Sequence, residues 1–201
     1  MSAVVEFRPD YPLCTARLRL RPVTAADAGA VLAYRSLPEV CRYVPFEPMT
    51  PAEIAERIAG RWSRTAVDDE GVFLGIALAD SDRVIGDLSL FPGAAVHRGA
   101  ELGWVLNPSY SGHGYATEAV HALMHLAFDG VGLHRVTARV DVRNEPSLRL
   151  ADRLGMRREA HLVANEWFKG AWSDEIDFAL LEDEWAAAHP GGSGSCRWPL
   201  A

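Results

Sequence analysis

The sequence predicts a single α/β domain built on a mostly antiparallel sheet, and two patterns carry this prediction. Apolar, β-rich runs at 73–79 and 84–91 are separated by only four polar residues, which is typical of a β-hairpin. Further along, an amphipathic segment from about 115 to 129 lies between two apolar runs, and such a strand, helix and strand unit pairs its strands in parallel. A length of 201 residues leaves room for one such domain and little for a second.

Before the hairpin, the chain is predicted to form one strand and two helices. Leucine and arginine alternate over 18–21, as a half-buried strand requires. Thr24 can cap the first helix, which carries Val31 and Tyr34 on its core face. The second helix starts sharply, because the segment 50–53 combines a capping threonine, a proline at the first helical position and a glutamate that completes a capping box. Apolar residues then recur at helical spacing, namely Ile54, Ile58 and Trp62.

After the hairpin, the sheet is predicted to continue through further strands. These expected strands are 100–106, 136–142, 159–166 and 173–181. The helix after the first of them can end at Gly130, and a short helix over 144–154 follows the second. Residues 1–188 are therefore expected to form the domain, and the tail 189–201, rich in glycine and serine, is expected to be disordered.

Composition and charge exclude several classes of protein. The formal net charge of −7 disfavours a nucleic-acid partner, which needs clustered lysine and arginine, and suits a cationic substrate better. The sequence has no apolar stretch near the roughly 18 residues of a membrane span, and its start lacks the basic and apolar segments of a secretory signal. Cys14, Cys41 and Cys196 lack metal-ligand spacing and are odd in number, which argues against a disulfide framework. We therefore expect a cytoplasmic protein that binds neither nucleic acid nor a membrane.

The segment 111–118, Ser-Gly-His-Gly-Tyr-Ala-Thr-Glu, carries the clearest functional signal. It leaves a strand and enters an amphipathic helix, where the first backbone N–H groups have no partner and the helix dipole is positive. The amides of Gly112 to Thr117 could therefore hold a pyrophosphate, although glycine also serves a plain strand-to-helix turn. A Walker-type loop needs a lysine that is absent, and the dinucleotide fingerprint needs glycine where Thr117 stands.

Four motifs in order resemble the acetyl-CoA-binding core of the GNAT superfamily of N-acetyltransferases. They are Glu101-Leu102-Gly103-Trp104-Val105-Leu106, the segment 111–119, Asn144-Glu145-Pro146-Ser147 and Leu154-Gly155-Met156. Two further segments, 15–22 and 169–174, are similar to the branch that acetylates the amino termini of ribosomal proteins. The resemblance covers about residues 15–185. It implies a GNAT fold, an α/β fold whose mixed, mostly antiparallel central sheet of about six to seven strands has helices on both faces.

The resemblance also implies direct transfer of an acetyl group from acetyl-CoA to an amine in a ternary complex. The residues that it assigns to acetyl-CoA are Trp104, Val105, Leu106, Gly112, His113, Gly114, Tyr115, Ala116, Thr117 and Asn144. Backbone N–H groups over 104–106 would also stabilise the oxyanion. Two positions depart from the family's pattern. Ser111 replaces a usual glutamine or arginine near the phosphates, and Ala151 replaces a tyrosine general acid, a role for which Ser147 matches the serine of the ribosomal-protein branch.

Glu101 is the expected general base, because an amine nucleophile must lose a proton to a nearby carboxylate, directly or through water. It is out of phase with Leu102 and Trp104, so its side chain should leave the face that those residues bury. The alternative is a surface glutamate on an edge strand. Ser147 could donate a proton to the departing thiolate or only satisfy a backbone amide at the helix start. Asn144 could likewise bind the pantetheine arm or cap the same helix.

Metal and thiol chemistry are not expected from the sequence. His121 and His125 are four residues apart, as metal ligands can be, but no third ligand is evident and a solvated helix face explains them. No histidine is placed in the sequence to activate a cysteine thiol. We therefore expect acetyl-CoA as cosubstrate and no metal.

The sequence leaves the amine acceptor open. The amino terminus of a ribosomal or other protein, a small amine such as an antibiotic or polyamine, and a non-catalytic CoA-binding module all fit the pattern, and a dinucleotide oxidoreductase is a further alternative. The residues expected around the acceptor are Tyr43, Phe46, Glu47, Trp167, Trp172 and Asp174. Their aromatic and acidic groups would suit a cationic amine bound by a monomer or homodimer.

Overall fold

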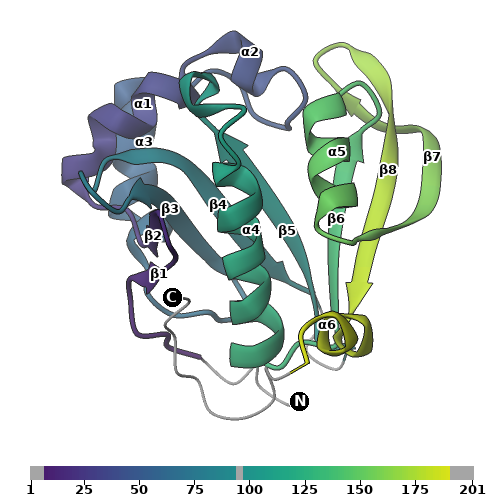
Figure 1. Ribbon diagram of the computed structural model, residues 1–201. Coiled ribbons are helices and arrows are strands. Elements are labelled where there is room, and N and C mark those ends of the chain that lie inside the picture. Colours follow the sequence, from purple (N-terminus) through teal and green to yellow (C-terminus); the bar gives the residue numbers. More distant parts are fainter. Residues whose placement is uncertain (1–6, 94–96, 191–201) are drawn as a thin grey trace.

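The computed structural model describes residues 7–93 and 97–190, and an eight-stranded sheet runs through them (Figure 1). Its strands are β1 (Leu13–Cys14), β2 (Leu18–Arg21), β3 (Val72–Leu78), β4 (Val84–Pro92), β5 (Gly99–Leu106), β6 (Arg135–Asp141), β7 (Arg157–Phe168) and β8 (Ala171–Leu181). The spatial order is β1-β2-β3-β4-β5-β6-β8-β7. All neighbouring strands are antiparallel except β5 and β6, which are parallel.

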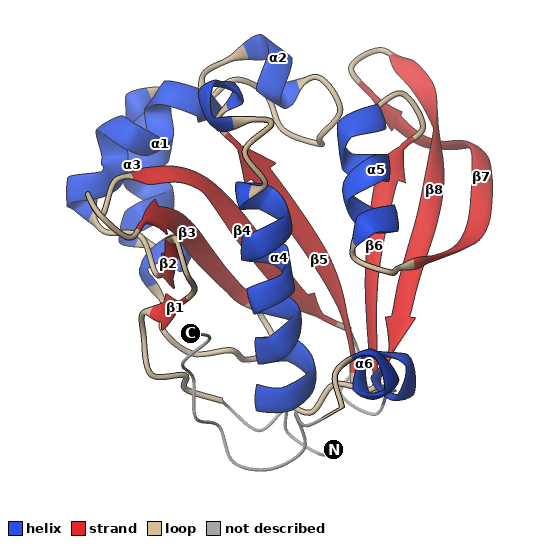
Figure 2. Cartoon of the chain, viewed as in Figure 1, coloured by secondary structure: helices blue, strands red, loops and turns tan. Residues whose placement is uncertain are grey.

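Helices cover both faces of this sheet (Figure 2). They are α1 (Ala28–Arg35), α2 (Pro38–Cys41), α3 (Pro51–Ala59), α4 (Tyr115–His125), α5 (Glu145–Arg153) and α6 (Glu182–Ala188). One apolar core lies between the sheet and α1 and α3, and includes Val31 and Ile54. The larger core packs α4 and α5 against the other face through residues such as Leu123 and Leu150. Among the described residues, no helix combines the length and apolarity needed to cross a membrane.

Most elements predicted from the sequence are present. The predicted hairpin is β3 and β4, the meander continues into β5, and Thr50 and Glu53 form the capping box of α3. The helix predicted over 115–129 is α4 followed by a π-helical turn, Leu126–Gly130. The sequence pattern misses β1, which is too short to show alternation and raises the strand count to eight. It also misses α6, which follows β8 without an intervening turn residue.

The two parallel strands diverge, and this divergence positions the candidate site. β5 and β6 pair only where residues 99–101 lie opposite residues 135–137. Beyond these pairs both strands continue, to Leu106 and Asp141, without pairing to each other among the described residues. α4 and α5 both begin at the end of the sheet where β5 and β6 end (Figure 1). Unpaired strand edges and two helix N-termini are therefore brought to the same end of the molecule.

Candidate active site

The turn between β5 and α4 presents a set of backbone N–H groups. Gly112 and Gly114 have φ angles of 82° and 80°, in the left-handed region that favours glycine, and α4 begins directly after them. No side chain caps this helix, and among the described residues no backbone carbonyl accepts from the N–H groups of 112–117. A Cβ added to Gly112 would meet no atom within 4 Å, so the turn faces open space. These are the features of an anion site at a helix N-terminus.

Arg17 and Glu118 anchor this turn to the start of β2, a role that the sequence does not predict. Arg17 donates to the carbonyl oxygen of His113 at 2.9 Å and to the carboxylate of Glu118 at 2.7 Å, and its guanidinium lies 4.7 Å from the centre of the Tyr115 ring. Burial acts to raise the pKa of Glu118, but hydrogen bonds from Thr15 and Arg17 outweigh it and hold that pKa below its ordinary value. The first turn of α4 is thus held by an ionised, hydrogen-bonded carboxylate.

The edge of β5 that faces β6 offers further N–H donors. Asn107 donates its N–H to Ile85 of β4 at 2.8 Å. Hydrogen-bonding direction alternates along a strand, so Val105 also faces β4, whereas Trp104 and Leu106 direct their N–H groups toward β6. β6 does not pair with β5 at this level. Trp104 and Leu106, two of the three strand residues expected to contact the cofactor, therefore direct backbone N–H groups into the space between the diverging strands β5 and β6. Val105 does not.

A cavity of about 510 Å³ lies between the diverging strands and the segment before α3. The predicted site residues that line it are Glu101, Trp104, Val105, Asn144 and Ser147. Aromatic rings form much of the remaining wall, from Tyr43, Phe46, Trp62, Phe73, Phe91 and Phe168. Leu106 and the predicted residues of 112–117 do not line it. The predicted site is therefore divided into a cavity and a separate glycine turn at 112–117.

Glu101 projects from the face of β5 that carries Val105, opposite the face packed under α4, as its phase in the sequence predicts. Of the alternative, a surface glutamate on an edge strand, the edge strand is wrong because β5 is interior to the sheet, whereas the Glu101 side chain is exposed. Partial burial raises the pKa of Glu101 above the ordinary glutamate value, Arg139 opposes this shift, and Asp177 and Glu175 add to it. A raised pKa makes this carboxylate a stronger base than an exposed glutamate.

Ser147 is held by an indole and does not cap its helix. The Trp104 Nε1–H donates to Ser147 Oγ at 3.1 Å, which links β5 to α5 across the divergence. Asn144 is the residue that caps α5, because its side-chain oxygen accepts from the Ser147 backbone N–H at 3.3 Å. Since Ser147 Oγ accepts from the indole, its own hydrogen is available to an acceptor in the cavity. Ala151 is fully buried and does not line the cavity.

A buried ion pair lines the cavity near the aromatic wall. Arg35 of α1 donates to the carboxylate of Asp87 on β4 at 2.9 and 2.5 Å, and Tyr34 donates to the same carboxylate at 2.7 Å. Burial acts to lower the pKa of Arg35, but Asp87 outweighs it and the pKa is raised. The guanidinium lies 4.2 Å from the centre of the Phe46 ring. An aspartate within the apolar run 84–91 is the one sequence signal that could have indicated this pair.

The residues expected around the acceptor are only partly those of the cavity. Tyr43 and Phe46 line it, whereas four others do not, namely Glu47, Trp167, Trp172 and Asp174. The β7–β8 hairpin contributes the residues next to these in sequence, which are Glu166, Phe168 and Glu175. The reason is that successive side chains of a strand point to opposite faces. Lys169, at the hairpin turn, fixes this arrangement by donating to the carbonyl oxygens of Cys41 and Phe46 at 2.5 and 3.0 Å.

The prediction that His121 and His125 lie on a solvated face of α4 is wrong. Both side chains are half-buried, and their rings lie 5.2 and 4.7 Å from the ring of Trp185 on α6. A third imidazole, from His189, stacks on Trp185 at 3.9 Å. This residue belongs to the tail expected to be disordered, of which residues 191–201, including Cys196, lie outside the described part. Sequence reasoning misses this contact because it misses α6.

The chain is similar to known proteins over most of its length. A family model described as Acetyltransferase (GNAT) domain matches residues 17–157. YnaD of Bacillus subtilis, named an uncharacterized N-acetyltransferase, is 33% identical over 178 residues, which cover 86% of this chain and 98% of that protein. YdaF of the same species, provisionally named a ribosomal N-acetyltransferase, is 29% identical over 138 residues, 69% of this chain and 74% of that one. The spermidine N-acetyltransferase of Vibrio cholerae, solved in complex with CoA and spermine, has the same fold, with a TM-score of 0.74 at 22% identity over 85% of this chain and 99% of that one.

Proposed function

Because this chain belongs to the GNAT acetyltransferase family and is an acetyl-CoA-dependent N-acetyltransferase, we propose that its acceptor is the N-terminal α-amine of a polypeptide. The observation that carries the proposal is one cavity lined both by the carboxylate of Glu101, whose pKa is raised, and by the hydroxyl group of Ser147. The proposal places the enzyme in the cytoplasm, with residues 1–188 as its acetyltransferase domain.

The glycine turn fits the pyrophosphate of acetyl-CoA. Its N–H groups over 112–117 donate to no backbone carbonyl among the described residues, Gly112 leaves open space above the backbone, and the positive end of the α4 dipole lies there. The N–H groups of Trp104 and Leu106 suit the amide-containing pantetheine arm along the edge of β5. When bound, acetyl-CoA supplies a thioester carbonyl and a thiol leaving group.

Three groups of the chain then serve the transfer. Glu101 takes the proton of the acceptor ammonium, directly or through one water, so that the amine can attack. The N–H groups of β5 at the divergence stabilise negative charge that develops on the carbonyl oxygen. Ser147 Oγ–H gives its proton to the departing sulfur and takes the second proton of the attacking nitrogen, directly or through one water, so that the serine hydroxyl is restored. The indole N–H of Trp104 keeps this hydroxyl oriented.

The charges around the cavity support an acceptor with one ammonium group near Glu101. Carboxylates of β5, β6, β7 and β8 supply negative charge on the side of the strands, namely Glu101, Asp141, Glu166 and Glu175. Arg57 and Arg61 line the side of α3, where the guanidinium of Arg61 lies 4.7 Å from the centre of the Phe91 ring. Fixed cations disfavour the second and third charges of a polyamine, whereas the residues after a peptide's first ammonium are backbone amides.

The acceptor class is tested by comparing short peptides of varied first residue with spermidine and spermine. We expect the best peptide to exceed both polyamines in kcat/KM by about tenfold or more, a difference of about 1.4 kcal/mol. Arg61→Gln should raise the polyamine rate about fivefold, because removing one partly exposed like charge is worth about 1 kcal/mol, and should leave the peptide rate nearly unchanged. Faster acetylation of spermidine, together with no effect of Arg61→Gln, would show a small-molecule enzyme instead.

Replacing Ser147 by alanine tests the proton donor. We expect kcat to fall about tenfold with acetyl-CoA affinity unchanged, because water can partly protonate a thiolate whose conjugate acid has a pKa of about 8.5. Trp104→Phe, which removes the indole N–H and keeps an aromatic ring, should give a smaller loss in the same direction.

A thioester with a better leaving thiol is the control for the assignment of Ser147 as proton donor. It should rescue Ser147→Ala more than wild type, since less proton donation is then needed. If the thioester affects both proteins equally and only the melting temperature of Ser147→Ala changes, Ser147 is structural and solvent supplies the proton.

A further inference from the structure

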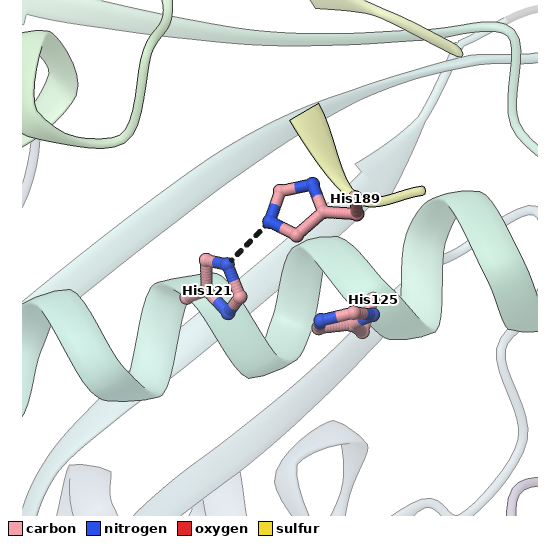
Figure 3. Close-up of side chains that lie close together, drawn as sticks. All are labelled: His121, His125 and His189. Atoms are coloured by element: carbon pink, nitrogen blue, oxygen red, sulfur yellow. Dashed lines mark hydrogen bonds between the residues drawn. The ribbon is translucent and has the colours of Figure 1, made fainter. Parts of the chain in front are cut away.

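Three histidines from distant parts of the chain meet on the face of α4 beside α6, outside the catalytic cavity (Figure 3). His121 and His125 lie one turn apart on α4, and His189 directly follows α6. One ring nitrogen of each lies within 4.8 Å of those of the other two. His121 Nε2 and His189 Nε2 are 3.0 Å apart, and Figure 3 shows these two rings pointing toward each other.

Hydrogen bonds on the far side of two rings select the nitrogen that can act as a ligand. His125 Nδ1 lies 2.7 Å from the carboxylate of Asp129, and His189 Nδ1 lies 3.0 Å from the carbonyl oxygen of Trp185. Both acceptors require Nδ1 to carry the hydrogen, which assigns the lone pair to Nε2 in each neutral ring. An imidazole whose other nitrogen donates to a carboxylate or carbonyl is the usual arrangement of a metal-bound histidine.

Hydrogen bonds behind these rings keep them in place, and burial disfavours the charged form of His121. The Trp185 indole donates to Asp129 at 3.2 Å, so the carboxylate behind His125 is itself fixed. Burial lowers the pKa of His121, and the neighbouring His125 and His189 lower it further. A neutral imidazole is the form that binds a metal ion, so this shift favours His121 as a ligand.

We propose that His121, His125 and His189 form a binding site for one first-row divalent metal ion, Zn²⁺ above all. Three imidazoles with a water in the fourth position satisfy tetrahedral Zn²⁺. Zinc–nitrogen bonds of about 2.0–2.1 Å place two ligand nitrogens about 3.4 Å apart, close to the 3.0 Å between His121 Nε2 and His189 Nε2. Because His189 Nε2 carries the lone pair, His121 Nε2–H donates in the metal-free protein, and this hydrogen moves to His121 Nδ1 when the ion binds. The His125 ring must move closer to the other two rings to supply the third ligand, because the three ligand nitrogens now lie within 4.8 Å of one another.

Such a site would join the end of α6 to the helix that begins at the glycine turn. His189 lies beyond α6, whereas His121 lies in the second turn of α4, after Tyr115. A bound ion therefore stabilises the packing of α6 on α4, and because it binds only the folded chain it raises the melting temperature. This role is independent of the acceptor that the enzyme uses.

The test uses the full-length protein without a histidine tag, with Cys14→Ser and Cys196→Ser to remove thiol ligands. Calorimetry with Zn²⁺ and the visible spectrum of bound Co²⁺ measure stoichiometry, affinity and geometry. We expect one tetrahedral ion per chain and a higher melting temperature with Zn²⁺. His189→Ala and His121→Ala should lower affinity by more than about 100-fold. Asp129→Asn should lower it by about 10–100-fold, because the carboxylate that fixes the His125 ring is lost. His161→Ala, on β7 and paired with Asp174, is the matched control and should bind like the parent.

Equal Zn²⁺ affinity in the parent, His121→Ala and His189→Ala would overturn the site, as would the absence of stoichiometric Zn²⁺ or Co²⁺ binding to the parent. The three rings would then be a hydrogen-bonded cluster without a metal. If an alanine variant does not fold by circular dichroism, His121→Gln and His189→Gln, which retain side-chain volume, answer the same question.

Discussion

Replacing Glu101 by glutamine should lower kcat/KM at neutral pH by about 10²–10⁴, the contribution typical of a general base. The amide keeps the shape of the side chain but cannot take the proton of an ammonium acceptor. Acetyl-CoA affinity should be unchanged, because Glu101 lies in the cavity and not on the glycine turn. Steady-state thiol release and calorimetry on the same preparation measure the two effects. Glu56→Gln, an exposed change on α3, is the matched control and should keep the parent rate.

The pH dependence sharpens this test. Glu101 is active only when ionised, so the wild-type rate is lost as pH falls through its pKa, which partial burial places above the ordinary glutamate value. The rate of the Glu101→Gln variant should not show this decrease at low pH. Its deficit should narrow above about pH 8, because a peptide α-amine with a pKa of about 7.7–8.0 then arrives neutral. A Glu101→Gln enzyme that keeps the wild-type rate across the whole range would place the base elsewhere.

Gly112→Asp should weaken acetyl-CoA binding by about 10²–10³. The residue has a φ of 82° and a Cβ there meets no atom within 4 Å, so the new carboxylate would project into the space assigned to the pyrophosphate. Two like charges about 4 Å apart repel by about 4 kcal/mol at an effective dielectric constant near 20. Gly114→Asp is a weaker design, because a Cβ there lies 3.4 Å from Arg17 Nη2 and its carboxylate could pair with that guanidinium.

Gly112→Asn is the matched control for this variant. Asparagine and aspartate both tolerate the left-handed region and have the same shape, so the pair differs in charge alone. Calorimetry should show a modest loss for Asn and the large loss for Asp. Equal affinities of the two variants would remove the pyrophosphate from this turn.

Features set by local sequence could be predicted, because they depend on neighbours a few residues away. The glycine turn before α4 follows from two glycines before an amphipathic helix, and the direction of Glu101 follows from strand alternation. The strand pairing followed in the same way from the apolar runs and their connections, including the parallel pair that creates the divergence.

Side-chain contacts between distant segments could not be predicted. Arg17 and Glu118, which fix the turn, are 101 residues apart, and the indole of Trp104 meets Ser147 only because β5 and α5 face each other across the divergence. The β7–β8 hairpin illustrates the role of register. Glu166 and Trp167 are adjacent on β7 and point to opposite faces, so Glu166 lines the cavity whereas Trp167 is exposed. No sequence pattern specified which of these two residues faces the cavity.

The central claim is that this chain moves an acetyl group from acetyl-CoA to an amine within the cavity of Glu101. The most direct test mixes the purified enzyme with saturating acetyl-CoA and a panel of short peptides and small amines, and measures CoA thiol and acetylated product together. The account predicts one free thiol for each amide formed, with a peptide among the best acceptors and with Glu101→Gln reducing both products equally. Tight acetyl-CoA binding without thiol release for any amine would contradict it and leave the chain as a CoA-binding module.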